Sequence, residues 1–303
     1  MFGFRATKEN SAPLPHMADS SLSSRPVPTT VAVLGCGWLG LPLAKALVAE
    51  GYAVNGSTTT PSQLLTLRDE GIRPYLLRLG PEFSQIDADS LHALLAGADV
   101  LVLNVPPRAA AAGAYPNLLR PVGSAVAAAG VRHVLFVSST SVYPNEARTM
   151  READAVSSPD APSDLLRAEG QFTPRWGQWL TTVVRLGGLF GPERPPGRFL
   201  AGRQQLEQGN APVNLIHLDD CVGLLQHIIR ERAWGYTFNA CAAQHPTRRV
   251  FYPAAAAQLG MEAPTFRPEE ADASGKIIDS SLLRQVTGYK FHHDDLLAAL
   301  EYC

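Results

Sequence analysis

Three glycines with one and two residues between them follow a short apolar run near the start of the chain. The run is Val31 to Leu34, and the glycines are Gly35, Gly37 and Gly40. This spacing lets the backbone come close to a pyrophosphate, and a helix that starts here offers free N–H groups to it. The pattern predicts the strand–helix–strand unit of a dinucleotide site. The expected cofactor-binding residues are Gly35, Cys36, Gly37, Trp38, Leu39 and Gly40. We interpret Cys36 as a small packing residue rather than a nucleophile.

The position that distinguishes NAD from NADP carries no carboxylate. An acidic residue about 20 positions after the first glycine normally binds the ribose 2′-hydroxyl of NAD. Here the segment Gly56 to Thr60 contains only glycine and hydroxyl residues, so Ser57, Thr58 and Thr59 are expected to accept a 2′-phosphate. NADP(H) is therefore the preferred cofactor, with NAD(H) as the alternative. These hydroxyls could equally cap a helix at Pro61. The arginines nearest in sequence are Arg68 and Arg73.

A second group of candidates lies directly after two apolar runs that predict buried strands. Asn104 is near the end of the first run, and Ser138-Ser-Thr-Ser-Val-Tyr143 continues the second. Open parallel sheets bind ligands at the carboxyl ends of their strands. Asn104 and Ser138 are therefore expected at the cofactor, and Ser139 and Tyr143 are candidate catalytic residues. The alternatives are that Ser139 caps a turn and that Tyr143 packs in the core.

Four further residues could hold an anion or move a proton. Arg185 could bind a phosphate at the cofactor, or it could pair with a buried acid. Arg198, in a Pro-Gly loop, could hold a substrate phosphate. His217 ends an apolar run and has a pKa range suited to acid–base work, although most such histidines are structural. Lys276 could reach the substrate or remain at the surface.

Composition excludes several classes of partner. The chain has 303 residues and a formal net charge of −2, with no cluster of Lys and Arg, so we expect no nucleic-acid partner. No apolar run approaches the roughly 20 residues that span a bilayer, so no membrane segment is expected. The four cysteines are widely scattered, which indicates neither a disulfide framework nor a metal site. A cytoplasmic protein with a small-molecule substrate fits these observations.

Apolar runs and helical periods alternate along the chain, which predicts an α/β fold with a Rossmann-type, doubly wound parallel sheet. Residues 1–28 are rich in Ser and Pro and are expected to form a disordered tail, within which Met17 could be the true start. Residues 29–186 and 213–240 are assigned to the nucleotide-binding domain. The alternation of apolar runs and helical periods becomes weaker in residues 187–212 and 241–303, which we assign to a smaller substrate-binding lobe. The expected strands cover 31–34, 52–55, 74–79, 99–105, 131–137, 181–186, 213–217 and 236–240, and the main expected helices 41–50, 61–71, 90–97, 115–129, 219–231 and 247–259.

Several motifs together resemble the extended, atypical branch of the short-chain dehydrogenase/reductase superfamily, often labelled NAD-dependent epimerase/dehydratase. The resemblance covers about residues 30–300. The chain departs from the usual Gly-x-x-Gly-x-x-Gly opening because Leu34 stands at the first glycine. The motifs that carry the resemblance are Gly35-Cys-Gly-Trp-Leu-Gly40, Ser138-Ser-Thr-Ser-Val-Tyr143, Val184-Arg-Leu-Gly-Gly-Leu-Phe-Gly191, Pro196-Gly-Arg-Phe199 and Val213-Asn-Leu-Ile-His-Leu-Asp-Asp220.

The resemblance implies a mechanism that this sequence only partly matches. In the family, a serine or threonine after the fifth strand binds the substrate oxygen, and Ser139 matches it. A tyrosine then gives or takes a proton, and a lysine four residues later lowers its pKa. That pair is expected near residues 161–168, which contain neither residue, and no tyrosine in the chain has Lys at the fourth following position. A tyrosine near its free pKa of about 10 is a poor base at neutral pH.

Three functions remain open at this point. The first is an NADP(H)-dependent oxidoreductase or epimerase/dehydratase-like enzyme, acting on a carbonyl or hydroxyl of a substrate that could resemble a nucleotide sugar. The second is a sensor or regulatory protein that binds the nucleotide without chemistry, which the missing Tyr-x-x-x-Lys pair favours. The third is a hydroxyacid-dehydrogenase-like enzyme, which the Gly-x-Gly start fits but the Ser138–Tyr143 segment does not.

Overall fold

The computed structural model describes residues 30–107, 111, 113–173, 179–268 and 275–303. The predicted tail, residues 1–28 with Met17, lies outside this part of the chain. Within the described ranges, no helix combines the length and apolar character that crossing a membrane would require.

Seven parallel strands form the main sheet of the described chain. Their spatial order is β10-β7-β5-β4-β1-β2-β3, so the order reverses between β1 and β4. This reversal is the switch point at which open α/β sheets bind ligands. The strands are β1 (Thr30–Leu34), β2 (Ala53–Thr58), β3 (Arg73–Leu76), β4 (Val100–Leu103), β5 (His133–Ser139), β7 (Leu180–Leu186) and β10 (Thr237–Ala240). The predicted Rossmann-type fold is confirmed.

Helices cover both faces of this sheet, as the buried residues show. Leu43 and Leu47 of α1 (Gly40–Ala49) share one apolar core with Leu224 and Ile228 of α7 (Leu218–Glu231). The helices α2 (Gln63–Asp69) and α9 (Ser281–Thr287) contribute to the same core. The opposite face packs on α3 (Gln85–Leu95), α4 (Tyr115–Ala129) and α5 (Asp164–Phe172). Strands that are buried on both faces have continuous apolar sequences, and this is why β4 could be predicted from the sequence.

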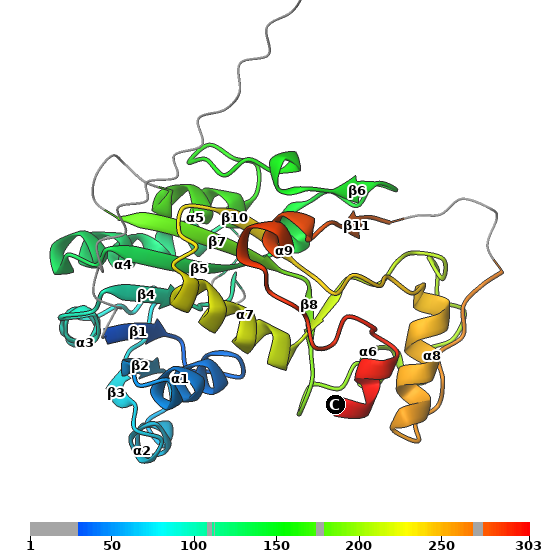
Figure 1. Cartoon of the computed structure of the whole chain (residues 1–303), viewed down its shortest axis with the longest axis horizontal. Coiled ribbons are helices and arrows are strands. Elements are labelled where there is room, and N and C mark those ends of the chain that lie inside the picture. The colour runs from blue at the N-terminus through cyan, green and yellow to red at the C-terminus, as the bar shows by residue number, and fades with distance from the viewer. Residues whose placement is uncertain (1–29, 108–110, 112, 174–178, 269–274) are drawn as a thin grey trace, which may run out of the picture.

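Smaller elements lie at the carboxyl edge of the sheet and beyond it (Figure 1). Two short parallel pairs occur, one between β6 and β11 and one between β8 and β9. The elements are β6 (Thr149–Met150), β8 (Gly188–Phe190), β9 (Leu215–His217), β11 (Ile277–Ile278), α6 (Gly197–Leu200), α8 (Arg248–Gln258) and the 3₁₀ turns η2 (Thr140–Val142), η3 (Glu152–Asp154) and η4 (Ala298–Tyr302).

A separate apolar core lies under α8 and η4. It contains Phe190, Phe251 and Leu300, and α8 lies apart from the helices that cover the sheet (Figure 1). Leu283 of α9 and Tyr289 belong instead to the core between the sheet and α7. The exact division into nucleotide domain and smaller lobe stays a prediction.

Candidate functional site

The glycine turn after β1 is shaped by close contacts at its first and third glycines. Gly35 has φ +106°, and a Cβ added there would lie 2.5 Å from the carbonyl oxygen of Asn104. A Cβ at Gly40 would lie 2.0 Å from the carbonyl oxygen of Gly35, so α1 can approach the turn only without a side chain. Gly37 differs, because, apart from Gly37 itself and its two neighbours in the chain, no heavy atom of the described residues lies within 4 Å of the point where a Cβ would stand. The middle glycine thus borders free space at the switch point.

Two predicted cofactor residues hold this turn in place. The Ser57 hydroxyl accepts a hydrogen bond from the backbone N–H of Gly35 at 2.9 Å. The Asn104 side-chain amide donates to the carbonyl oxygen of Gly35, also at 2.9 Å. Cys36 donates its backbone N–H to the carbonyl of Ser57 at 2.8 Å. These bonds fix the turn across β1, β2 and β4 before any ligand arrives.

Cys36 is buried beneath the turn, which agrees with its prediction as a packing residue. Its side chain is buried, and a Cβ added at Gly56 would lie 2.7 Å from its sulfur. Burial raises the pKa of the Cys36 thiol to about 12, so the thiol stays protonated near neutral pH. A protonated, buried thiol is not a nucleophile.

The hydroxyl segment at the end of β2 contains one buried threonine, Thr58, and two exposed ones, Thr59 and Thr60. The Thr58 hydroxyl donates to the side-chain oxygen of Gln63 at 2.9 Å and accepts from the backbone N–H of Thr60 at 3.1 Å. Thr58 thus supports the start of α2, in line with the capping alternative. Thr59 is exposed, and its carbonyl accepts a hydrogen bond from Nε of Arg78 at 3.4 Å. Sequence reasoning missed Arg78, which reaches Thr59 because β3 pairs with β2.

Trp38 and Leu39 connect the turn to its surroundings. Leu39 is buried in the core of the sheet. The Trp38 indole N–H donates to the carbonyl of Pro192 at 2.8 Å, and the Arg194 guanidinium carbon lies 5.6 Å from the Trp38 ring centroid. The loop that follows β8 is therefore held against the glycine turn.

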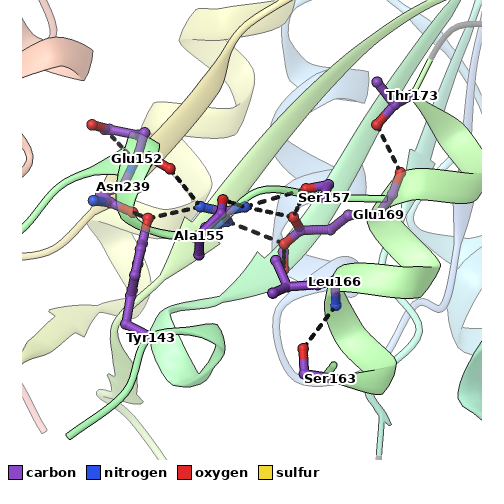
Figure 2. A network of polar contacts seen from close by, with 11 residues as sticks. Tyr143, Glu152, Ala155, Ser157, Ser163, Leu166, Glu169, Thr173 and Asn239 are labelled. Carbon is purple, nitrogen blue, oxygen red and sulfur yellow. Dashed lines mark hydrogen bonds and ion pairs between the residues drawn. The ribbon is translucent and has the colours of Figure 1, made fainter. Parts of the chain in front are cut away.

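Arg185 and Glu169 form a buried ion pair. The side chains are 1% and 0% exposed, and Nη2 of Arg185 lies 2.8 Å from Oε2 of Glu169. Glu169 also accepts hydrogen bonds from the hydroxyls of Ser138 and Ser157, and Figure 2 shows Ser157 beside Glu169. Arg185 donates further to the carbonyl of Ala155 at 2.9 Å. The structure therefore places Ser138 and Arg185, both expected at the cofactor, among protein partners, in agreement with the buried-acid alternative for Arg185.

Tyr143 belongs to the same network. Its hydroxyl donates to Oδ1 of Asn239 at 2.7 Å and accepts from Nη1 of Arg185 at 2.8 Å, as the contacts on the left of Figure 2 show. Tyr143 is buried, and burial raises the pKa of its phenol even though Arg185 acts in the opposite direction. The phenol is therefore protonated at neutral pH and cannot serve as a base. This geometry favours the packing alternative for Tyr143.

Ser139 and Lys276 both form hydrogen bonds with the η2 turn, and Lys276 also bonds its flanking residue Tyr143. Ser139 is half-buried, and its hydroxyl accepts from the backbone N–H of Ser141 at 3.1 Å, which leaves its proton free to donate. Nζ of Lys276 donates to the carbonyls of Thr140 and Tyr143 at 3.0 and 2.7 Å. Burial lowers the pKa of the Lys276 ammonium. The structure thus brings an amine from residue 276 to the turn that carries Ser139.

His217 and Arg198 lie elsewhere. His217 is buried at the N-terminus of α7, where its Nδ1 accepts from the backbone N–H of Asp219 at 3.2 Å. Burial lowers the pKa of its imidazole. Arg198 is exposed on α6. The contacts of these two residues do not tie them to the Ser139 turn.

Comparisons with known proteins agree with the Rossmann-type fold. Residues 30–158 match the family model described as the NAD binding domain of 6-phosphogluconate dehydrogenase. A structure from Methylobacillus flagellatus, provisionally named an NAD-dependent epimerase/dehydratase, has a TM-score of 0.66 and 24% identity, covering 91% of this chain and 100% of that one. MoeE5, solved with UDP-glucose and NAD, has a TM-score of 0.66 and 18% identity over 90% of this chain and 96% of its own. Human epimerase family protein SDR39U1, solved with NADPH, has a TM-score of 0.61 and 20% identity, covering 90% of this chain and 98% of that one.

A curated relative shows the family. Protein YeeZ of Escherichia coli strain K12 is 37% identical over 276 residues, which cover 88% of this chain and 97% of that protein. The chain therefore belongs to the same family as Protein YeeZ and has the fold of the NAD-dependent epimerase/dehydratases of the extended short-chain dehydrogenase/reductases, as its motifs predict.

Proposed function

We propose that this protein binds NADP(H) at the Gly35–Gly40 turn and acts as an oxidoreductase or epimerase/dehydratase-like enzyme on a carbonyl or hydroxyl group of a small molecule. The observation that carries the proposal is the free space at Gly37 beside a turn that Ser57 and Asn104 already hold in place. A pyrophosphate needs both the space and the preformed backbone donors at the start of α1. The residues present therefore fit a dinucleotide.

The choice of NADP(H) over NAD(H) rests on the segment at the end of β2 and on Arg78. No carboxylate occurs in Ser57 to Thr60 to bind a free ribose 2′-hydroxyl. Thr59 is exposed there, and Arg78 already contacts its carbonyl at 3.4 Å. An arginine beside this position is the usual partner of a 2′-phosphate, because its planar guanidinium donates two hydrogen bonds to phosphate oxygens.

Replacing Arg78 tests the cofactor preference. We expect Arg78→Gln to weaken NADPH binding by at least tenfold and to leave NADH binding within about twofold, since a charge-assisted hydrogen bond contributes roughly 1.5–3 kcal/mol. Arg73→Gln is the matched control, because Arg73 begins β3, the strand that precedes Arg78, and its guanidinium carbon lies 5.8 Å from the Tyr75 ring centroid. Calorimetric titration of the three proteins with both nucleotides gives the answer. Equal losses for NADPH and NADH would contradict a 2′-phosphate role for Arg78.

The chemistry is proposed to run at the turn after β5. The nicotinamide supplies or accepts hydride when bound. The Ser139 hydroxyl, whose proton is free to donate, would hold the substrate oxygen. Lys276, with its pKa lowered by burial, is the amine whose contacts bring it to this turn, and it would stand in for the missing Tyr-x-x-x-Lys pair as the proton donor. Exposed Arg198 would bind a substrate phosphate, and a nucleotide sugar such as that bound by MoeE5 is the candidate substrate class.

Replacing Ser139 separates substrate chemistry from cofactor binding. We expect Ser139→Ala to reduce turnover at least tenfold without changing the Kd for NADPH, measured with UDP-glucose and UDP-glucuronic acid as probes of hydride transfer. Ser141→Ala is the control, because Ser141 is exposed and the substitution keeps the backbone N–H that it donates to the Ser139 hydroxyl. Loss of turnover and cofactor affinity together, or of neither, would contradict the proposed role.

A nucleotide-binding sensor is the second candidate. The specific observation in its favour is that Tyr143 is buried and its hydroxyl is hydrogen-bonded to both Asn239 and Arg185. A sensor would bind NADPH with the same dependence on Arg78 but would show no turnover with any probe. Both candidate functions therefore predict the same NADPH binding, and only the turnover measurement with substrate probes distinguishes them.

A further inference from the structure

We propose that His217, Asp219 and His293 form a binding site for a divalent transition metal ion of the zinc type at the N-terminus of α7. Each residue offers one ligand atom, and no two of these atoms lie more than 4.8 Å apart. Two imidazoles and one carboxylate are a ligand set that suits zinc and neighbouring first-row ions. The cysteine and histidine spacing in the sequence indicated no metal site, because His293 is far from the other two residues along the chain.

The hydrogen bonds of His217 fix its tautomer in the form that a metal needs. Nε2 lies 3.2 Å from the carbonyl oxygen of Tyr302, which can only accept, so Nε2 carries the proton. Nδ1 accepts a hydrogen bond at 3.2 Å from the backbone N–H of Asp219, so Nδ1 is the unprotonated nitrogen, and a bound ion would replace this hydrogen bond at its lone pair. Metal-binding histidines commonly donate their second ring N–H to a backbone carbonyl in this way.

The carboxylate of Asp219 sits between the two rings. Its Oδ2 lies 3.4 Å from Nδ1 of His217 and 3.0 Å from Nε2 of His293. In the contact between Nδ1 of His217 and Oδ2 of Asp219, both atoms are acceptors and no proton lies between them, so they repel each other. A cation placed between the two atoms would attract both. The ring centroids of His217 and His293 are 4.0 Å apart. Two zinc ligands at about 2 Å from the ion lie no more than roughly 4 Å from each other, so the ligand atoms would move closer together when an ion binds.

Asp220 holds the segment that carries His293 against α7. Its buried carboxylate accepts from the backbone N–H of His292 at 2.7 Å, from that of His293 at 2.9 Å and from the Tyr289 hydroxyl at 3.2 Å. With these bonds, the backbone of His293 is placed before any ion binds. Asp220 is therefore a positioning residue and not a ligand.

The site opens into a cavity of about 640 Å³ at the contact between α1 and α7. Asp219 and His293 line it together with Pro42, Gln226 and Tyr302. Three protein ligands beside open space leave a coordination position for water or a small ligand, which is how catalytic zinc sites are built. Its lining comes from α1, α7 and the C-terminal segment rather than from the Ser139 turn, so this is a second site, and its test measures metal binding without the cofactor.

Zinc titration tests the proposal on the untagged full chain after removal of metal with EDTA. We expect one equivalent of Zn²⁺ to bind in equilibrium dialysis at pH 7.5, and Co²⁺ to give a visible absorption band when bound in its place. Asp219→Asn and His293→Gln should each weaken Zn²⁺ binding at least tenfold. His292→Gln is the matched control, because His292 is the next residue and lines the same cavity but is outside the ligand cluster. It should bind Zn²⁺ as the unchanged protein does.

Thermal unfolding of the metal-free variants checks that each one folds, so that lost binding is not lost structure. Failure of the unchanged protein to bind Zn²⁺ at micromolar concentrations would overturn the proposal. Equal Zn²⁺ affinity in His293→Gln and His292→Gln would also overturn it, because the ion would then be held adventitiously elsewhere.

Discussion

At the residue scale, the buried ion pair of Glu169 and Arg185 is expected to stabilise the folded protein. Glu169→Gln would leave the Arg185 charge buried with no counter-charge, which costs about 3–5 kcal/mol of unfolding free energy. Glu70→Gln is the control, because its partner Lys45 is 47% exposed and such surface pairs contribute about 1 kcal/mol or less. Urea unfolding followed by circular dichroism measures both. Similar small losses in the two variants would show that the buried pair does not stabilise the fold.

Individual residues were predictable where one local rule fixes the residue type. Gly35 and Gly40 must be glycine because a Cβ would strike backbone atoms, and the spacing alone revealed them. Arg78 was not predictable, because its contact with Thr59 depends on the pairing of β2 with β3. Tyr143 has the residue type of a catalytic group, yet its role depends on partners distant in sequence, Arg185 and Asn239.

At the element scale, helix caps offer a matched pair of serines. Ser163 precedes α5, and its hydroxyl accepts from the backbone N–H of Leu166 at 3.1 Å. Ser62 precedes α2 without such a side-chain bond. We expect Ser163→Ala to lower the unfolding free energy by about 1 kcal/mol and Ser62→Ala to change it by only a few tenths. Thermal and urea unfolding of both variants decide this, and equal effects would contradict the capping assignment.

The elements themselves were largely predictable from apolar periodicity. The helix expected at 115–129 is observed with those bounds as α4. The strand expected at 52–55 extends to Thr58, because Gly56 and two hydroxyl residues continue the sheet where no apolar side chain signals it. The helix expected from residue 90 begins at Gln85, after a capping box of Ser84 and Asp87. Polar residues mark these ends, so hydrophobic pattern alone could not find them.

At the scale of the whole molecule, topology brings the site together. The carboxyl ends of β1, β2, β4 and β5 lie at one edge of the sheet, so residues far apart in sequence meet there. The sequence predicted this convergence from the alternation of strands and helices. It could not predict that residue 276 would return to the Ser139 turn, because the short β6–β11 pair that carries Lys276 there has almost no sequence signal.

The most direct test of the cofactor site is calorimetric titration of the full chain with NADPH and NADH, for the unchanged protein and for Gly37→Ala. A methyl group at Gly37 meets no described atom and so spares the fold, but it would occupy the space proposed for the pyrophosphate. Gly123→Ala, in the middle of α4 and equally free of contacts, is the control. We predict tighter binding of NADPH than of NADH, at least tenfold weaker NADPH binding in Gly37→Ala and no change in Gly123→Ala. Absence of NADPH binding in the unchanged protein, or equal affinity in Gly37→Ala, would contradict the proposed site.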